Sequence, residues 1–505
     1  MSESLFVNET VREILSRYKT IWAIEHSMSL LSWDLEVSMP SEGVQERATA
    51  LAELKLLSRK LILQDVAPLV DKVAGREDLN EYERGVVRVL SRMIDRLRKV
   101  PERLHYEIAK TAAEATTVWR EAKKRGDFEL FKPHLEKIVS LTREVSEHVG
   151  YDEHPYDPLL DFFEENLRDR DVRALFSSLV PGLRKILDEI LSSGIYPREH
   201  ELENVKYDVG AMEKVNREVL DLLGYPWSRG RLDVSAHPFS TSIGLKDVRI
   251  TTRYEGVDFK RTLFSVIHEF GHALYELQVD ERFAFTPLAQ GVSLGVHESQ
   301  SRFWENVVGR SRAFVELVSP ILRSHLGFLE GYSDRDIYLY FNTVKPSLIR
   351  VDADEVTYNF HVYLRYQLER SLIAGEVKVS ELPELWNGMM EELLGVKPKS
   401  HSEGVLQDIH WSQALIGYFP TYTIGTLLSA QIKARMEVES GRSLSEIIAS
   451  GKRGIEYMKS YLREKIHRFG SLYPPDELVA KSLGEKLNPE YFLRYLEEKY
   501  LRAPS

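Results

Sequence analysis

Cysteine is absent from the 505 residues of this chain. Disulfide bonds, a zinc site built on thiolates and a cysteine nucleophile are therefore excluded. A chain without cysteine suits the reducing cytosol, and it also suits a hot environment, where proteins use fewer thermolabile residues. We therefore expect a cytoplasmic protein, and the many Glu, Lys and Arg residues favour thermostability.

Basic stripes and membrane-spanning runs are lacking too. The formal net charge is −11 and the acidic residues are spread along the chain, so nucleic acid is excluded as a partner. The N-terminal residues MSESLFVNETVREIL contain no basic region followed by an apolar stretch, which argues against a signal peptide. The longest uncharged run, Trp411 to Ile432, contains Pro420 and several hydroxyl groups. We interpret it as a buried segment that lines a polar cavity, not as a membrane span.

Helical periodicity dominates the sequence, and a mostly α fold follows from it. Apolar residues make up 43% of the chain and charged residues 29%, as in globular proteins. Amphipathic helices are predicted near residues 8–32, 46–65, 80–99, 103–125 and 132–149. Since no repeat or flexible linker interrupts the pattern, we expect one catalytic domain over residues 1–505. Its N-terminal helical part, 1–150, would form one wall of a groove, and 151–505 would carry the catalytic site.

One stretch departs from the helical pattern. Between Ser235 and Tyr254, the residues Val248, Ile250 and Thr252 alternate with other side chains in the manner of a strand. A glycine separates this piece from an earlier extended one. The pattern predicts a short β-hairpin or small sheet next to the active site, where a strand could hold an extended peptide by main-chain pairing.

The motif HEFGH, His268 to His272, carries the chemistry. Residues 261–277 have helical periodicity and no proline, so the two imidazoles lie on one face and can share one zinc ion. Glu269 follows the first imidazole and can accept a proton from the water that attacks the substrate. A motif with three fixed letters also arises by chance, but its helical context favours a metal site.

A catalytic zinc ion needs a third protein ligand. The HExxHxxGxxH arrangement is missing, because Gln278 stands where its last histidine would be. Glu276 lies one turn beyond His272, where the helix axis carries it away from the metal. Glu298, on what looks like a second helix packed against the first, is the better candidate, although a helical Glu is more often solvated.

The chain resembles the carboxypeptidase Taq family of thermostable metallocarboxypeptidases almost from end to end. Seven segments carry the resemblance, in this order: LLSWDLEVSMPSEGVQERA at 30–48, GYDEHPYDPLLDFFE at 150–164, HPFSTSIGLKDVRITTRY at 237–254, HEFGHALYE at 268–276, SLGVHESQSRFWEN at 293–306, IRVDADEVTYN at 349–359 and GVLQDIHWSQALIGYFPTY at 404–422.

The resemblance implies the chemistry and the assembly. Its metal ligands correspond to His268, His272 and Glu298, and its general base corresponds to Glu269. It implies one zinc ion per chain, with cobalt able to serve, and a homodimer. The fold it implies is a large helical, groove-containing zinc-peptidase fold, whose long helices would exclude folded proteins from the groove.

Substrate-binding roles are predicted for residues in two of these segments, and for Tyr422 in a third. Arg350 follows Pro346 in a predicted helix and would grip a C-terminal carboxylate with its guanidinium group. The alternative is a structural ion pair with Asp352 or Asp354. Arg249 and His237, in the predicted hairpin, would assist in substrate binding, and for Arg249 a structural role is the alternative.

His410, Tyr418 and Tyr422 are candidates for stabilising the oxyanion. An imidazole and a phenol aimed at the scissile carbonyl would hold the negative charge that develops there, as in other helical zinc peptidases. Either tyrosine could take this role, and Tyr422 could bind the substrate carboxylate instead. The alternative is that these aromatic residues belong to the core.

Three positions depart from the family pattern. Asp352 stands where Glu is usual, Ala414 stands where Gly is common, and Glu165-Asn166 replaces a Pro-Gly turn. None is a proposed ligand or the proposed base, so these departures bear on local loops and substrate preference.

We therefore predict a metal-dependent carboxypeptidase that removes single C-terminal residues from peptides with a free C-terminus. An oligopeptidase or peptidyl-dipeptidase on the same fold is the nearest rival. A helical binding protein that keeps zinc for structure alone is the rival from another class, although structural zinc sites usually have four protein ligands.

Overall fold

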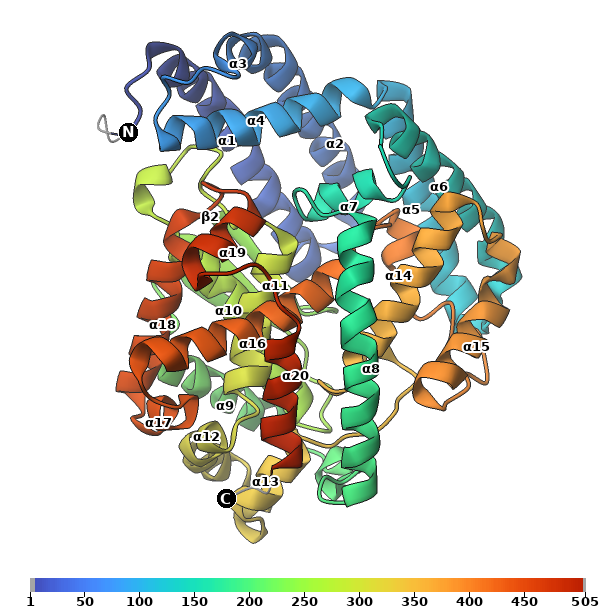
Figure 1. Ribbon diagram of the computed structural model, residues 1–505, viewed down its shortest axis with the longest axis vertical. Helices are drawn as coiled ribbons and strands as arrows, with labels where there is room; N and C mark the ends of the chain where they lie inside the picture. The colour runs from blue at the N-terminus through green and yellow to red at the C-terminus, as the bar shows by residue number, and fades with distance from the viewer. Residues whose placement is uncertain (1–4, 503–505) are drawn as a thin grey trace. The chain divides into compact units, whose positions relative to one another are not determined.

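The amphipathic segments of the N-terminal region are helices in the computed structural model, which describes residues 5–502 (Figure 1). Two of them show how a boundary residue sets a helix end. The side chain of Asn8 caps the first helix by accepting hydrogen bonds from the backbone of Thr10 and Val11. Gly126, with a φ of 67°, ends the fifth. These helices are α1 Glu9–Val37, α2 Val44–Leu61, α3 Ala67–Val73, α4 Glu81–Lys99, α5 Glu102–Arg125 and α6 Phe128–Val149.

Helices also dominate the rest of the chain, which confirms the mostly α prediction. They are α7 Asp157–Phe163, α8 Asp169–Ser193, α9 Val209–Leu223, α10 Lys260–Leu277, α11 Leu294–Arg302, α12 Arg312–His325, α13 Asp334–Phe341, α14 Tyr358–Ala374, α15 Leu382–Leu394, α16 Pro420–Ser440, α17 Leu444–Ala449, α18 Lys452–Lys465, α19 Pro475–Leu483 and α20 Glu490–Leu496. No helix within residues 5–502 is long and apolar enough to cross a membrane.

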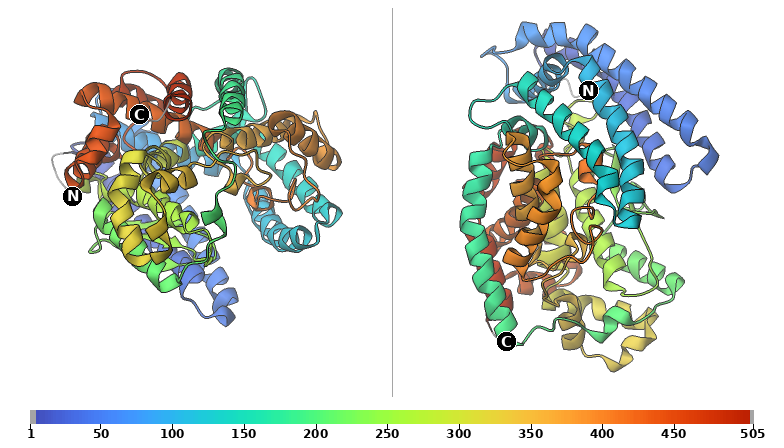
Figure 2. Two further views of the ribbon diagram at one scale, coloured as in Figure 1. Left: turned by 90° about the horizontal axis from the view of Figure 1, so that it is seen from below. Right: turned by 90° about the vertical axis from the view of Figure 1, so that its right-hand side faces the viewer.

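The fold divides into two compact units, each assembled from three separate segments. The first unit contains residues up to Leu97, Glu201–Phe341 and Gln431–Lys486. Within it, α1 and α2 lie side by side as a helical hairpin (Figure 2). Aliphatic side chains of α1, α3 and α4 form a shared core with a few residues from the later segments. The division of the chain into 1–150 and 151–505 around a groove stays a prediction.

The second unit contains Arg98–His200, Asn342–Ala430 and residues 487–502. Helices α5 and α6 pack against each other along their length, and α14 packs on α15. A small apolar cluster joins α5 and α6 through the buried side chains of Leu104, Leu141 and Val145. The candidate oxyanion and carboxylate residues belong to this unit.

A three-stranded sheet confirms the predicted small β element and adds one strand to it. The strands are β1 Gly230–Val234, β2 Ser240–Gly244 and β3 Asp247–Thr252, in the spatial order β1-β3-β2. β2 and β3 form the expected antiparallel hairpin, while β1, which the sequence did not reveal, pairs parallel to β3. β3 contacts α10, and its Val248 and Ile250 are buried. The sheet therefore backs the helix that carries HEFGH.

The helix predicted at Arg350 is wrong. Residues Arg350–Asp352 form a single 3₁₀ turn, and α14 begins only at Tyr358. The side chain of Asp354 accepts hydrogen bonds from the backbone of Val356 and Thr357, so it starts a new turn and interrupts the helical path. Arg350 consequently lies on a turn held by tertiary contacts.

Two of the departures from the family pattern fall on left-handed backbone. Asn166 has a φ of 68° and Ala414 a φ of 57°. The resemblance implies that Gly is common at 414 and typical at 166, and this conformation favours glycine. Asn tolerates the left-handed region well, whereas Ala is strained there.

Candidate metal centre

Helix α10 presents the HEFGH motif from the core of the first unit. Its residues around the motif, among them Ile267, Phe270 and Leu274, are buried, which fixes the orientation of the helix. The imidazoles of His268 and His272 lie one turn apart with their ring centroids separated by 4.9 Å. Both rings therefore face the same side of α10, as the spacing predicts.

Gly271 lets a second helix approach this face. A Cβ atom at this position would lie 2.5 Å from the carbonyl oxygen of Gln300 and 2.6 Å from the Cα atom of Ser301, both backbone atoms of α11. Only glycine permits so close a contact. The approach brings Glu298 of α11 to the two imidazoles.

Three ligand atoms converge between these helices. Oε2 of Glu298 lies 3.6 Å from Nε2 of His268 and 3.4 Å from Nε2 of His272. Two donors that are each bonded to one tetrahedral zinc ion lie about 3.3 Å apart, given zinc–ligand bonds of about 2.0–2.1 Å. Within residues 5–502 these three side chains are the one group of this kind that could hold a metal ion. Two imidazoles and one carboxylate form a suitable donor set for a divalent metal.

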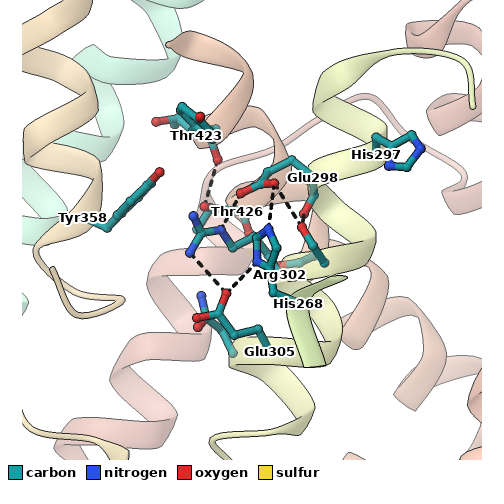
Figure 3. A network of polar contacts seen from close by, with 12 residues as sticks. His268, His297, Glu298, Arg302, Glu305, Tyr358, Thr423 and Thr426 are labelled. Carbon is teal, nitrogen blue, oxygen red and sulfur yellow. Dashed lines mark hydrogen bonds and ion pairs between the residues drawn. The ribbon is translucent and has the colours of Figure 1, made fainter. Parts of the chain in front are cut away.

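A ring of polar contacts holds two of the three candidate ligands (Figure 3). Nδ1 of His268 is 2.8 Å from Oε2 of Glu305, which leaves Nε2 to face Glu298. Arg302 donates from Nε to Oε1 of Glu298 over 2.7 Å, and its Nη1 lies 3.5 Å from Glu305. Ser301 donates its hydroxyl to Oε2 of Glu298 over 3.0 Å. Hydrogen bonds to the ligands orient them in metal sites generally. These contacts to His268 and Glu298 are therefore what a metal site would need.

Burial and neighbouring charges shift the acidity of these groups. Burial disfavours the charged ring of His268, but the carboxylates of Glu298 and Glu305 outweigh that effect and raise its pKa to about 9. Burial would raise the pKa of Glu298, but Arg302 and His268 hold it well below its usual range. A proton and a metal ion would compete for the same nitrogen of His268, so metal binding there would release protons.

Glu269, the predicted base, is buried on α10 directly after the first imidazole, with a side chain in contact with the hydroxyl of Ser240 on β2. Burial raises its pKa to about 7, despite the opposing effects of His268 and Ser240. The carboxyl group is thus poised between its two protonation states near neutral pH.

The predicted oxyanion residues gather in the second unit. Nε2 of His410 is 3.1 Å from the hydroxyl of Tyr422, and the ring of Tyr418 lies 5.3 Å from each of the other two rings. Burial lowers the pKa of His410 to about 3, and the positive charge of Arg350 adds to the effect, so its ring is neutral at neutral pH. The roles predicted for these three residues stay predictions.

Arg350 is buried and forms an ion pair with Asp408, whereas the sequence offered Asp352 or Asp354 as the partner. Its Nη2 lies 2.9 Å from Oδ1 of Asp408, whose Oδ2 is 2.6 Å from Arg365. Burial alone would raise the pKa of Asp408, but Arg365 and Arg350 hold it well below its usual range. Two guanidinium groups thus share one carboxylate, which leaves one positive charge in excess within this trio.

The remaining predicted substrate-binding residues lie on or beside the sheet of the first unit. Arg249 makes a two-point ion pair with Asp247, over 2.8 Å at both contacts, and stacks on Trp33. His237 is exposed in the loop before β2, and its carbonyl oxygen accepts a hydrogen bond from Ser235. Their substrate-binding roles stay predictions.

Comparison with known proteins decides the family. The family of carboxypeptidase Taq (M32) metallopeptidases matches residues 13–500. The chain belongs to this family. It is 54% identical to thermostable carboxypeptidase 1 of Pyrococcus furiosus over 99% of this chain and 100% of that one. It is 40% identical to thermostable carboxypeptidase 1 of Thermus thermophilus over 94% of both chains. A solved structure of Pyrococcus furiosus carboxypeptidase superposes with a TM-score of 0.96 at 54% identity, covering 98% of this chain and 100% of that one.

Membership makes this chain a metallocarboxypeptidase, as the resemblance implied, and a metal ion belongs to the chemistry of the family. The sequence did not single out Arg302 or Glu305, which support the candidate ligands of this M32 peptidase. Their spacing from Glu298, four and seven residues, places all three on one side of α11 and the π-helical turn Phe303–Val308. That spacing was the signal available in the sequence.

Proposed function

We propose that this metallocarboxypeptidase removes single C-terminal residues from peptides, with one zinc ion held by His268, His272 and Glu298. The observation that carries the proposal is the convergence of their three ligand atoms, two of them on side chains braced by Arg302 and Glu305. Cobalt is the alternative ion. When bound, the ion would supply a Lewis acid that polarises the scissile carbonyl and makes a water molecule reactive at neutral pH.

Glu269 is the general base of this proposal. Its carboxylate accepts a proton from the attacking water and delivers it to the leaving amine. Support comes from its position, adjacent to His268 on α10 and buried away from bulk solvent. Contact with Ser240 limits how the carboxyl group can turn.

Substrate binding is assigned mainly to residues of the second unit, with two assisting residues from the first. Arg350 grips the terminal carboxylate, a role supported by the positive charge in excess where Arg350 and Arg365 share Asp408. His410 and Tyr418 stabilise the oxyanion, and Tyr422 either joins them or binds the carboxylate. We assign His237 and Arg249 an assisting role in holding the peptide beside the sheet.

The decisive experiment compares the zinc-loaded protein with a Glu269→Gln variant on one peptide with a free C-terminus and on the same peptide with an amidated C-terminus. We expect the parent to shorten the free peptide one residue at a time, and the amide to resist. The variant should retain zinc but lose about 10²- to 10⁴-fold in kcat. An Arg350→Lys variant should raise KM for the free peptide. Internal fragments or dipeptides as products would favour the oligopeptidase or peptidyl-dipeptidase.

We further propose that the chain forms a homodimer and works in the cytoplasm. The family resemblance supports the dimer, and the absence of cysteine supports a reducing compartment. Sedimentation equilibrium of the purified protein tests for the dimer. Fractionation of cells of its source tests for the cytoplasmic location. A monomer at micromolar concentration would contradict the dimer.

A further inference from the structure

The two histidines of the metal site are braced in different ways. Nδ1 of His268 faces the carboxylate of Glu305 directly. Nδ1 of His272 instead lies 2.7 Å from Nδ1 of a third imidazole, His297 on α11, and the two ring centroids are 4.9 Å apart. His297 in turn places Nε2 at 2.8 Å from Oε1 of Glu276. A line of three side chains therefore runs away from the metal site.

The direction of the hydrogen bonds along this line follows from metal binding. A hydrogen bond between two ring nitrogens needs one donor and one acceptor. Nε2 of His272 must keep its lone pair for the metal, so its Nδ1 carries the hydrogen and donates to His297. The ring of His297 then carries its own hydrogen on Nε2 and donates it to Glu276. With a metal on His272, that histidine is consequently a donor, His297 both accepts and donates, and Glu276 accepts.

Glu276 is held firmly in this arrangement. It is buried one turn beyond His272 on α10, and its Oε1 also accepts a hydrogen bond from the backbone of Gly291 over 2.9 Å. A Cβ atom at Gly291 would lie 2.7 Å from the ring of His297 and 3.1 Å from Oε1 of Glu276. The ring of Tyr275 covers His297 at a centroid distance of 5.0 Å. The backbone of Gly291 and the ring of Tyr275 thus hold Glu276 and His297 in place.

The charge of Glu276 points to a cation at the far end of the line. Oε2 of Glu276 is buried and has no hydrogen-bond partner among residues 5–502. The contacts of this carboxylate in that part of the chain are His297 and the backbone of Gly291, neither of which brings a fixed positive charge. A divalent ion held by His272 would supply compensating positive charge through the two imidazoles.

We propose that His297, backed by Glu276, is a positioning residue that fixes the tautomer and the ring orientation of His272 for the metal. This inference rests on the proposed metal site. Outer partners of metal-bound histidines typically change metal affinity by about 10- to 100-fold when they are removed. His297 and Glu276 would therefore tune the affinity of the site for the ion.

The test measures zinc affinity directly, by competition of the full-length protein with a chelator and by metal analysis, so peptide cleavage is not needed. We expect His297→Ala to weaken zinc binding about 10- to 100-fold. His297→Gln should recover most of this loss, because its amide oxygen can accept from His272 while its nitrogen donates to Glu276. Glu276→Gln should give a smaller loss, since the hydrogen bond remains and the charge is removed. At saturating cobalt, the visible absorption bands should shift in His297→Ala and return in His297→Gln.

The matched control is His325→Gln, which alters another His–Glu pair of the same unit, with Nε2 of His325 at 2.7 Å from Glu218 on the surface. Its zinc affinity should equal that of the parent. Unchanged affinity in both His297→Ala and Glu276→Gln overturns the inference. Equal losses in His297→Ala and His297→Gln also overturn it, because they indicate packing alone. A parent protein that binds no zinc would instead refute the proposed metal site.

Discussion

Arg302 donates from Nε to Oε1 of Glu298 over 2.7 Å, while Oε2 of the same carboxylate faces the imidazoles of His268 and His272. One oxygen is thus held by a permanent cation, and the other is left for the metal. The guanidinium group also lies 3.5 Å from Glu305, which braces His268. Arg302 therefore balances two buried carboxylates whether or not a metal ion is bound.

An Arg302→Gln substitution should destabilise the metal-free protein more than the zinc-bound protein. Loss of one partner from a buried ion pair costs about 3–5 kcal/mol, because the remaining charge is uncompensated. Zinc restores positive charge beside Glu298, so the rise in Tm on adding zinc should be larger in the variant than in the parent. Differential scanning calorimetry with and without zinc measures this. An Arg312→Gln variant, which removes an exposed partner of Glu316, serves as the control. Equal zinc-induced rises in Arg302→Gln and the parent would contradict the prediction.

Gly271→Ala should weaken both the fold and the metal site. Its Cβ atom would meet the backbone of α11 at 2.5 Å, so the two helices must move apart. Overpacking of this kind costs about 1–3 kcal/mol, and it displaces Glu298 from the imidazoles. Urea unfolding measures the first effect, and chelator competition the second. As a control, Gly388→Ala introduces a Cβ atom on α15 with no heavy atom within 4 Å. If Gly271→Ala retained the zinc affinity of the parent, close approach of the helices would not be what positions Glu298.

Glu369 should make stability fall as the pH rises from about 5 to 8. It is fully buried and accepts hydrogen bonds from Tyr156, Trp411 and the backbone of Gly417. Burial raises its pKa from 4.5 to about 7. The folded state therefore binds a proton more tightly than the unfolded state does, and its advantage is complete below pH 4.5 and lost as the pH passes 7.

A Glu369→Gln variant isolates this contribution. A shift from 4.5 to about 7 corresponds to on the order of 3 kcal/mol. The free energy of unfolding of the parent should drop by that amount relative to the variant between pH 5 and pH 8, as measured by urea unfolding. Parallel pH profiles for the two proteins would show that Glu369 does not change its protonation state in this range.

Ala414→Gly should stabilise the second unit slightly. Ala414 has a φ of 57°, and a left-handed conformation costs a residue with a Cβ atom about 1–2 kcal/mol. Glycine removes that strain but makes the unfolded chain more flexible, at a cost of about 0.5–1 kcal/mol, so the net gain should be below about 1 kcal/mol. Ala414→Val, with a branched side chain in the same conformation, should lose stability. Thermal unfolding of the two variants and the parent measures both changes in Tm. A lower Tm for Ala414→Gly than for the parent would contradict the proposed strain.

Local patterns in the sequence predicted much of the metal centre. The four-residue spacing of His268 and His272 and the apolar periodicity around them predicted α10, which begins one residue before the expected range and ends with it. The need for a third ligand led to Glu298, because a chain without cysteine has few alternatives. Its helix, α11, packs on α10 as predicted.

Contacts between distant segments were not predictable in this way. Arg350 pairs with Asp408, 58 residues further along, whereas the nearby Asp352 and Asp354 were the partners considered from the sequence. β1 was missed because its short segment, with Arg231 and Asp233 within it, becomes a strand through parallel pairing with β3. Nor did the sequence show why the residue before Glu298 is a histidine, since its partners His272 and Glu276 lie on another helix. Each of these features depends on tertiary packing.

The metal-facing side chains and their braces all come from the stretch between His268 and Glu305, in one compact unit. The residues proposed to recognise the peptide terminus, Arg350 and Tyr422, come from segments of the other unit. A substitution that changes which peptide is selected can therefore leave the cation-binding stretch untouched.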